Sequence, residues 1–243
     1  MKNKFAALTI LLVLICFSSL RAQYKSEVYS AFVNNKMDQW KNVIDRMESV
    51  KGRDNEMIPE LINYQYGYIG YCLEYNKKDE AKKYFAIAEK NLETLEKENG
   101  NKSLINAYKS AFYGFRISFN AFSAPVNGPK SLDNAKLALE QDPDNYLAHV
   151  QCGNAYSNMP AAFGGSKKAA LEYFQKAKTI LEKGSGQTLE NWNYLKVLTL
   201  IAQTYTDLGD FNSARISYEN ILKIEPAFIY VRDEKYPELL KKK

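Results

Sequence analysis

The stretch TYTDLGDFNSARISYENILKIEP, residues 204–226, holds five residues at intervals typical of a turn between two packed helices: Tyr205, Gly209, Ala214, Tyr218 and Pro226. Gly209 tolerates the left-handed backbone that ends a helix, and Asp210 is a residue type that caps the next one. Ala214 is small enough to let two helices approach closely, while the two tyrosines fill the space between them. Since Pro226 cannot continue the second helix, the stretch predicts a helical hairpin.

The pattern recurs along the chain, because apolar residues return every three or four positions and do not alternate as they do in a strand. With a first helix predicted over residues 193–208, the stretch resembles the tetratricopeptide repeat, a helix-turn-helix unit of about 34 residues. The resemblance rests on the small, aromatic, glycine and proline positions of that family: Ala202, Tyr205, Gly209, Phe211, Ala214, Tyr218 and Pro226. Ile221 departs from the family pattern, since alanine is usual there.

Weaker copies of the unit precede this one, for example with Ala81, Phe85 and Ala88 in the second helix of an earlier hairpin. The first copy is degenerate and has Trp40 where alanine is usual. The resemblance implies an all-α fold, a right-handed α-solenoid of about five repeats that share one long core. We predict the repeats near five ranges, followed by a C-terminal cap: 24–55, 58–97, 103–143, 144–183 and 189–226, with the cap at 227–243.

Residues 1–22 have the three-part pattern of a secretory signal peptide, with two lysines, an apolar run over residues 5–17 and a short polar end. The apolar run is shorter than the roughly 20 residues that span a membrane. We therefore expect cleavage after Ala22 and export to the periplasm or the extracellular space, with no membrane-spanning segment in the mature chain.

A lipid anchor would use Cys16, but Ile15 stands directly before it, where lipoprotein signals normally place a small residue. We therefore do not expect an outer-membrane lipoprotein.

Without the leader the chain keeps 30 basic and 28 acidic residues, because the leader carries three of the 33 bases and no acid. This balance favours no nucleic-acid partner.

The residues that carry most enzyme chemistry are sparse. His149 is the single histidine and lies where a first helix normally packs, so we expect it to be buried rather than to bind a ligand. Cys72 and Cys152 lie in apolar helical patterns, which predicts two buried thiols rather than a disulfide or a metal pair. No Ser/His/Asp set, carboxylate pair or metal cluster stands out. We expect no enzyme activity, no cofactor and no metal. Carboxylates that are distant in sequence but close together in the folded chain would reopen the possibility of an enzyme.

In tetratricopeptide repeats the first helices line a concave surface. The resemblance gives a partner-binding role there to seven residues: Tyr66, Phe115, Phe119, Asn154, Asn158, Lys196 and Gln203. Amides and aromatics with few charges suit an extended peptide or a neighbouring protein. The simpler interpretation is that these side chains are merely exposed. Val150 and Leu200 stand where the carboxylate clamp of chaperone-tail-binding members needs bases, so we do not expect that specificity.

Two turns look stretched, over residues 123–131 and 158–166, each between a first and a second helix. Turns of this kind lie on the same edge of a stacked array, where insertions often bind a partner. Val126, Met159 and Phe163 would form an apolar lip there. The alternative is that the three side chains pack on one another and close the turns.

We therefore expect an exported, non-catalytic scaffold that binds a protein or an extended peptide in its groove. A second hypothesis comes from MPAAFGGSKKAALEYFQKA, residues 159–177. This stretch is similar to a pattern in exported bacterial repeat proteins, including the periplasmic T component of TRAP-type transporters, which delivers small ligands. A continuous open groove would favour the scaffold, and a deep pocket lined by Tyr66, Phe115 and Phe119 would favour the small-ligand protein.

Overall fold

The structure is a computed structural model that describes residues 20–51, 53, 56–184, 186 and 188–242. These residues form helices, turns and bends and contain no β-strand, which confirms the all-α prediction. Most of the predicted signal peptide, residues 1–19, lies outside the described residues. After a helix over residues 20–33, the α-helices are α2 (Met37–Ser49), α3 (Met57–Glu74), α4 (Lys78–Lys97), α5 (Lys102–Phe119), α6 (Ala124–Gln141), α7 (Tyr146–Asn158), α8 (Lys167–Glu182), α9 (Trp192–Asp207), α10 (Phe211–Ile224) and α11 (Tyr236–Leu240).

The hairpin of α9 and α10 forms for the reasons that its sequence predicts. Gly209 has a φ of 76°, the left-handed conformation that ends α9. The side chain of Asp210 accepts a hydrogen bond of 3.0 Å from the backbone N–H of Ser213 and so caps α10. Ala214 is fully buried between the two helices.

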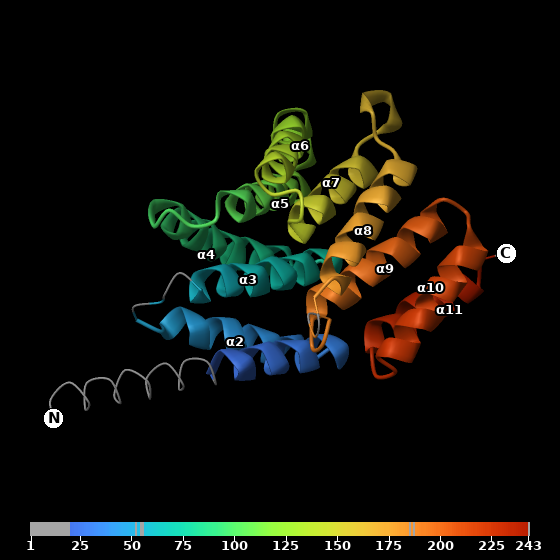
Figure 1. Cartoon of the computed structure of the whole chain (residues 1–243), viewed down its shortest axis with the longest axis horizontal. Helices are drawn as coiled ribbons and strands as arrows, with labels where there is room; N and C mark the ends of the chain where they lie inside the picture. The colour runs from blue at the N-terminus through green and yellow to red at the C-terminus, as the bar shows by residue number, and fades with distance from the viewer. Residues whose placement is uncertain (1–19, 52, 54–55, 185, 187, 243) are drawn as a thin grey trace, which may run out of the picture.

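Close helix packing repeats along the chain. Ala81 in α4 and Ala170 in α8 are as fully buried as Ala214 in α10, and each lies at the start of a second helix. No hairpin can bury its apolar side alone, so each one packs against the next. Figure 1 shows the resulting stack, which runs from the blue N-terminal pair to the red C-terminal pair and forms a helical solenoid.

The two ends of the solenoid are in contact. In the N-terminal helix, the Tyr29 hydroxyl donates a 2.7 Å hydrogen bond to Glu225, which directly follows α10. The ring of Phe32 lies 4.9 Å from that of Phe228 and 5.8 Å from that of Trp192, measured between ring centroids. We call the side of the solenoid formed by the first helix of each hairpin, namely residues 20–33, α3, α5, α7 and α9, the inner wall. This wall curls onto itself and is not an open surface along its whole length (Figure 1).

One of the two predicted stretched turns is wrong. Residues 124–131 are the first turns of α6, preceded by the short 3-10 helix η1 (Ala121–Ser123). Pro125 fits the first turn of a helix, where backbone N–H groups have no partner in the helix. Pro129 lies further inside α6, yet it is exposed to solvent. Water can therefore bond the backbone carbonyl that loses its partner. Two prolines and a glycine thus mark a helix start here, not a loop.

The second stretched turn is present. Residues 159–166 connect α7 to α8 through the 3-10 helix η2 (Ala161–Phe163). Gly164 has a φ of 94°, and the Ser166 side chain accepts a 3.2 Å hydrogen bond from the backbone N–H of Ala169, as predicted for a helix cap. None of the helices in the described part of the chain is both long enough and apolar enough to cross a bilayer.

Candidate binding site

Tyr66 is the centre of the inner wall. Its ring lies 6.3 Å from that of Tyr108, 5.7 Å from that of Phe115 and 6.4 Å from that of Trp192. These rings come from α3, α5 and α9, so the first helices of three units meet at one point. Tyr66 and Phe115 lie close together, but their rings pack against neighbours and do not stand free in an open groove.

A chain of amides connects Tyr66 to α7. The Gln151 side-chain nitrogen donates a 3.1 Å hydrogen bond to the Tyr66 hydroxyl, and Asn154 donates one of 3.4 Å to the Gln151 carbonyl oxygen. Burial raises the pKa of Tyr66, and the hydrogen bond from Gln151 opposes this rise. The hydroxyl therefore stays protonated, and within the described residues its proton has no acceptor. Sequence reasoning missed Gln151, although it lies one helical turn before Asn154.

Phe119 lies apart from this chain, one turn beyond Phe115 on α5. Its ring is 5.3 Å from that of Phe85, which is also 6.3 Å from the ring of Phe115. Phe85 belongs to α4, so Phe119 helps to join two successive hairpins. Both Phe115 and Phe119 keep part of their surface exposed. They can therefore contact a ligand only with the edge that α4 leaves uncovered.

Two predicted residues lie on α9 and differ in their surroundings. Gln203 donates a 3.1 Å hydrogen bond to the hydroxyl of Tyr230, which in turn donates to Glu74 of α3. The C-terminal segment therefore already occupies this part of the wall. Lys196 is half-buried, and no hydrogen bond or ion pair involves it within the residues that the structure describes. It is the predicted residue with the clearest capacity to bind a carbonyl or carboxylate oxygen.

The remaining predicted residues lie at the edge of the molecule. Asn158 is exposed at the end of α7 and donates a 2.8 Å hydrogen bond to the backbone carbonyl of Asn154. Val126 and Phe163 are exposed, and Met159 is half-buried. Val126 projects from α6 and the other two belong to the α7–α8 connection. Exposure of Val126 and Phe163 contradicts the alternative in which the lip closes on itself.

Two buried polar atoms, one on α3 and one on α9, have no hydrogen-bond partner among the described residues. They are the indole nitrogen of Trp192 and the amide oxygen of Asn63. Asn63 lies one turn before Gly67 on α3, and a β-carbon on Gly67 would come within 2.7 Å of the Trp192 ring. Unpaired buried donors and acceptors of this kind are able to bond a polar atom of a ligand. Asn63 occupies a groove position of the repeat, whereas the sequence offered no signal for Trp192, because its contact joins α3 to α9.

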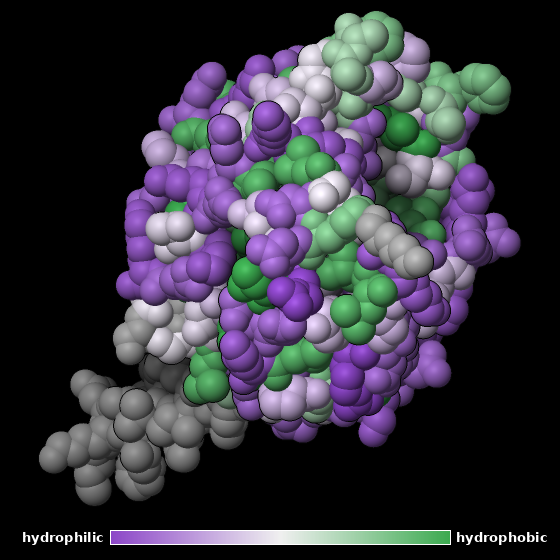
Figure 2. Space-filling model, turned by 90° about the vertical axis from the view of Figure 1, so that its right-hand side faces the viewer, coloured by the Kyte–Doolittle hydropathy of each residue, from purple (hydrophilic) through white to green (hydrophobic). Residues whose placement is uncertain are grey.

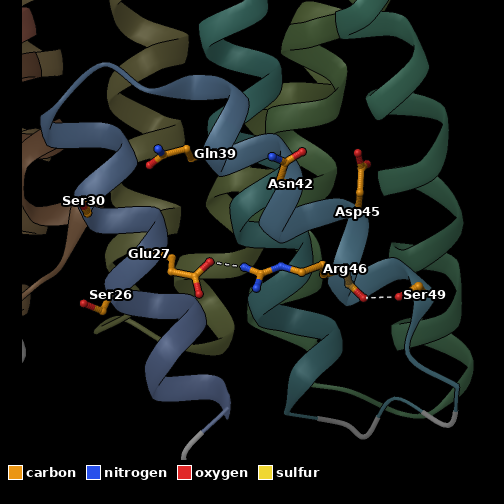
Figure 3. Close-up of a pocket in the computed structure, with 8 residues that line it drawn as sticks. All are labelled: Ser26, Glu27, Ser30, Gln39, Asn42, Asp45, Arg46 and Ser49. Carbon is orange, nitrogen blue, oxygen red and sulfur yellow. Dashed lines mark hydrogen bonds and ion pairs between the residues drawn. The ribbon is translucent and has the colours of Figure 1, made fainter.

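A depression of about 850 Å³ lies on the first hairpin. Figure 3 shows its eight lining side chains on the N-terminal helix and α2, and all are polar: Ser26, Glu27, Ser30, Gln39, Asn42, Asp45, Arg46 and Ser49. Glu27 pairs with Arg46, and Asp45 with Lys41 at 2.7 Å, so its charges are already neutralised. Polar outer faces are usual in terminal repeats, which cap the array.

His149 and the two cysteines are buried, as their sequence positions predict. His149 is buried, and its Nε2 lies 2.9 Å from the backbone carbonyl of Pro143, which can only accept, so Nε2 carries the proton. Cys72 and Cys152 are buried and unpaired, and burial raises the pKa of each thiol to about 11. Across the described residues, no three His, Cys, Asp or Glu side chains are placed to hold a metal ion.

One family model and two solved structures of known proteins resemble this chain. The family model of the tetratricopeptide repeat matches residues 195–228, the hairpin of α9 and α10. The solved structure of the HusA haemophore from Porphyromonas gingivalis has a TM-score of 0.58 and 20% identity, covering 76% of this chain and 93% of that chain. TTC0263, a thermophilic tetratricopeptide-repeat protein from Thermus thermophilus, has a TM-score of 0.55 and 17% identity, covering 85% and 93%. No curated protein matches the chain.

At these identities the likeness to solved structures concerns the fold. The matched hairpin is the one whose glycine, cap and buried alanine decide the helical turn, and the other hairpins stack on it in sequence order. The α9–α10 hairpin thus matches the tetratricopeptide repeat, and the chain shares its helical fold with a solved tetratricopeptide-repeat protein.

Proposed function

We propose that the chain is an exported, non-catalytic scaffold that holds an extended segment of another protein against its inner wall. Tetratricopeptide repeats generally bind protein partners, so the family supports binding as the activity. The inner wall offers amides, hydroxyls and aromatic edges, and these groups suit a peptide backbone.

The observation that carries the proposal is the set of Tyr66, Asn154 and Lys196. Tyr66 has a proton to donate, Asn154 has an amide oxygen, and half-buried Lys196 has a charge that no described residue neutralises. An extended peptide presents carbonyl oxygens and N–H groups in alternation, which these groups bond in turn. A lysine held this way is free to bind a carbonyl or carboxylate of the partner.

The partner would use only part of the wall. The C-terminal segment covers the end of α3 and the middle of α9, through Tyr230 with Gln203 and Glu74. The inner faces of α5 and α7 have no such cover among the described residues, and Asn154 and Phe115 keep exposed surface there. We therefore place the peptide across α5 and α7, with Lys196 at one end.

The test is capture of partners by the tagged chain from the exported fraction of the producing cells. The double variant Asn154→Ala with Lys196→Ala should lose the captured partner. The control is Asn212→Ala with Lys223→Ala, which removes the same residue types from exposed positions on α10. If the groove variant and the control recover every partner equally, the inner wall is not the binding surface.

Export has its own test. Mass spectrometry of the chain from its native cells should find an N-terminus at Gln23, in a fraction outside the cytoplasm. A mature chain that keeps Met1 and remains in the cytoplasm would refute export but leave the groove proposal standing.

A second candidate is a carrier of a small, flat ligand. The unpaired indole nitrogen of Trp192, whose ring lies 6.4 Å from that of Tyr66, favours it, as does the unpaired amide oxygen of Asn63 on the same helix as Tyr66. One of the similar structures is a haemophore, which makes haemin a suitable probe. Haemin should quench the fluorescence of Trp40 and Trp192 and shift its own absorption band, and Trp192→Phe should weaken both changes. Unchanged fluorescence and absorption at saturating haemin would remove this candidate.

A further inference from the structure

Two phenylalanines stand exposed at the tips of adjacent hairpins. Phe122 in η1 is 95% exposed and Phe163 in η2 is 78% exposed. Every other phenylalanine within the described residues is buried or half-buried. Val126, one turn after Phe122, adds a further apolar side chain that is 60% exposed. Burying such side chains is favourable, so two of them left in water at neighbouring tips need an explanation.

The tips are held in place by their own hydrogen bonds. The Asn120 side chain accepts a 3.1 Å hydrogen bond from the backbone N–H of Phe122, and the Ser123 hydroxyl donates one of 2.7 Å to the Asn120 carbonyl. In the other tip, the backbone N–H of Phe163 donates to the carbonyl of Pro160 at 2.9 Å. Both phenylalanines therefore project from a turn with a fixed shape, and little ordering is needed before they bind.

Both tips lie at the same end of the molecule. The η1 tip joins α5 to α6 and the η2 tip joins α7 to α8, and these two hairpins pack against each other. Figure 1 draws α6 and the α7–α8 connection at its top. Figure 2 shows apolar side chains, in pale green, that project from this same end. The two aromatic side chains are thus able to contact one surface together.

The two segments that form the tips carry lysines and no acidic residue. No Asp or Glu occurs between Glu98 and Asp133, or between Asp144 and Glu172. These two acid-free stretches contain both tips and their nearest lysines. Lys130 and Lys168 are exposed, and neither has an ion-pair partner within the described residues. Lys130 lies 5.8 Å from the centre of the Tyr113 ring.

We propose that this edge docks on an anionic lipid bilayer, with Phe122 and Phe163 in the interface and Lys130 and Lys168 at the headgroups. A bilayer accepts separate projecting side chains, whereas the pocket of a protein partner grips one continuous patch. Free lysines behind the apolar tips complement negative headgroups. This contact needs no membrane-spanning helix and does not involve the inner wall, so it stands apart from the proposed groove.

The test is cosedimentation of the folded chain with vesicles of phosphatidylcholine, with and without phosphatidylglycerol. We expect binding to the mixed vesicles that weakens as NaCl rises. Phe122→Ser with Phe163→Ser should reduce the partition coefficient about tenfold or more, because two exposed apolar side chains are lost. Lys130→Gln and Lys168→Gln should each reduce it about fivefold.

The control is Leu189→Ser, which removes a side chain that is 71% exposed in the α8–α9 connection, at the lower end of Figure 1. It should bind vesicles as the wild type does, and the circular dichroism of all variants should match. If the chain does not sediment with the mixed vesicles, the proposal is overturned, and binding of a protein partner becomes the explanation for the exposed tips. Equal sedimentation of the Phe122/Phe163 variant and the Leu189 control would overturn it as well.

Discussion

Aromatic residues behave in opposite ways in the interior and at the upper edge of this molecule. In the interior, Trp40 and Trp192 lie 4.9 Å apart with their rings nearly perpendicular, and 0% and 5% of their surfaces are exposed. At the edge, Phe122 and Phe163 are almost fully in water. Curling of the array buries the first pair, while the turns that connect the helices expose the second. The exposed pair therefore contributes little to stability and is free to serve binding.

Removing one ring from each region should give the largest contrast. Trp40→Ala should lower the free energy of unfolding by about 4 kcal/mol, because it deletes a fully buried ring and its 3.0 Å hydrogen bond to the carbonyl of Tyr64. Phe122→Ala should change it by less than about 0.5 kcal/mol. Urea denaturation of both variants measures the difference. Similar losses in the two variants would mean that the exposed tip is packed in solution.

Two glycines of α3 differ in how closely other side chains approach them. A β-carbon on Gly67 would lie 2.6 Å from the Trp40 ring and 2.7 Å from that of Trp192, whereas one on Gly70 would meet nothing within 4 Å. Gly67→Ala should therefore cost about 1–3 kcal/mol through overpacking. Gly70→Ala should stabilise the helix by up to about 1 kcal/mol, because alanine favours helix. Thermal denaturation should shift in opposite directions, and shifts of the same sign would contradict the close approach of α3 and α9.

The contact between the two ends of the solenoid is open to a smaller test. Tyr29→Phe removes the hydroxyl that donates to Glu225, which should cost about 1 kcal/mol. Tyr113→Phe is the control, since the Tyr113 hydroxyl makes no hydrogen bond to the rest of the described chain. Hydrogen exchange should also speed up in residues 20–33 of the Tyr29 variant. If both variants unfold at the same urea concentration, the ends do not hold each other.

The weakest effect that we predict is a dependence of stability on pH, caused by His149. Burial lowers the pKa of His149, and the charge of Lys176 lowers it further, against opposing effects from the Pro143 carbonyl, Asp144 and Asp142. The folded state therefore binds this proton less well than the unfolded state, so stability is full above about pH 6.5 and falls as the pH drops below it. The slope from one group stays under about 1.4 kcal/mol per pH unit.

The measurement is a series of urea denaturations between about pH 8 and pH 5, values that bracket the usual histidine pKa of about 6.5. His149→Gln should flatten the decline, because glutamine does not titrate in this range. A wild-type curve that is flat over the same interval, or one that keeps its slope in the variant, would show that His149 is not buried as a neutral side chain.

The residues by themselves determined the hairpin of α9 and α10. Gly209, Asp210 and Ala214 predict a turn, a cap and a close packing position, and all three take those roles. Ser166 likewise caps α8 as predicted. These features depend on backbone preferences and on hydrogen bonds within a few residues, so a short stretch contains all of the physical information that decides them.

Only the tertiary structure decided what the hairpins enclose. Tyr66 was predicted to line an open groove, yet Trp192 packs against its ring and Gln151 bonds its hydroxyl. These contacts depend on how tightly the whole array curls, which is set by many small packing angles between successive units. The prediction of a loop at residues 124–131 was wrong for a related reason. The helix continues there because Pro129 is exposed, and exposure depends on the neighbouring helices. Local preference decides the repeat, and long-range packing decides which of its faces remain open.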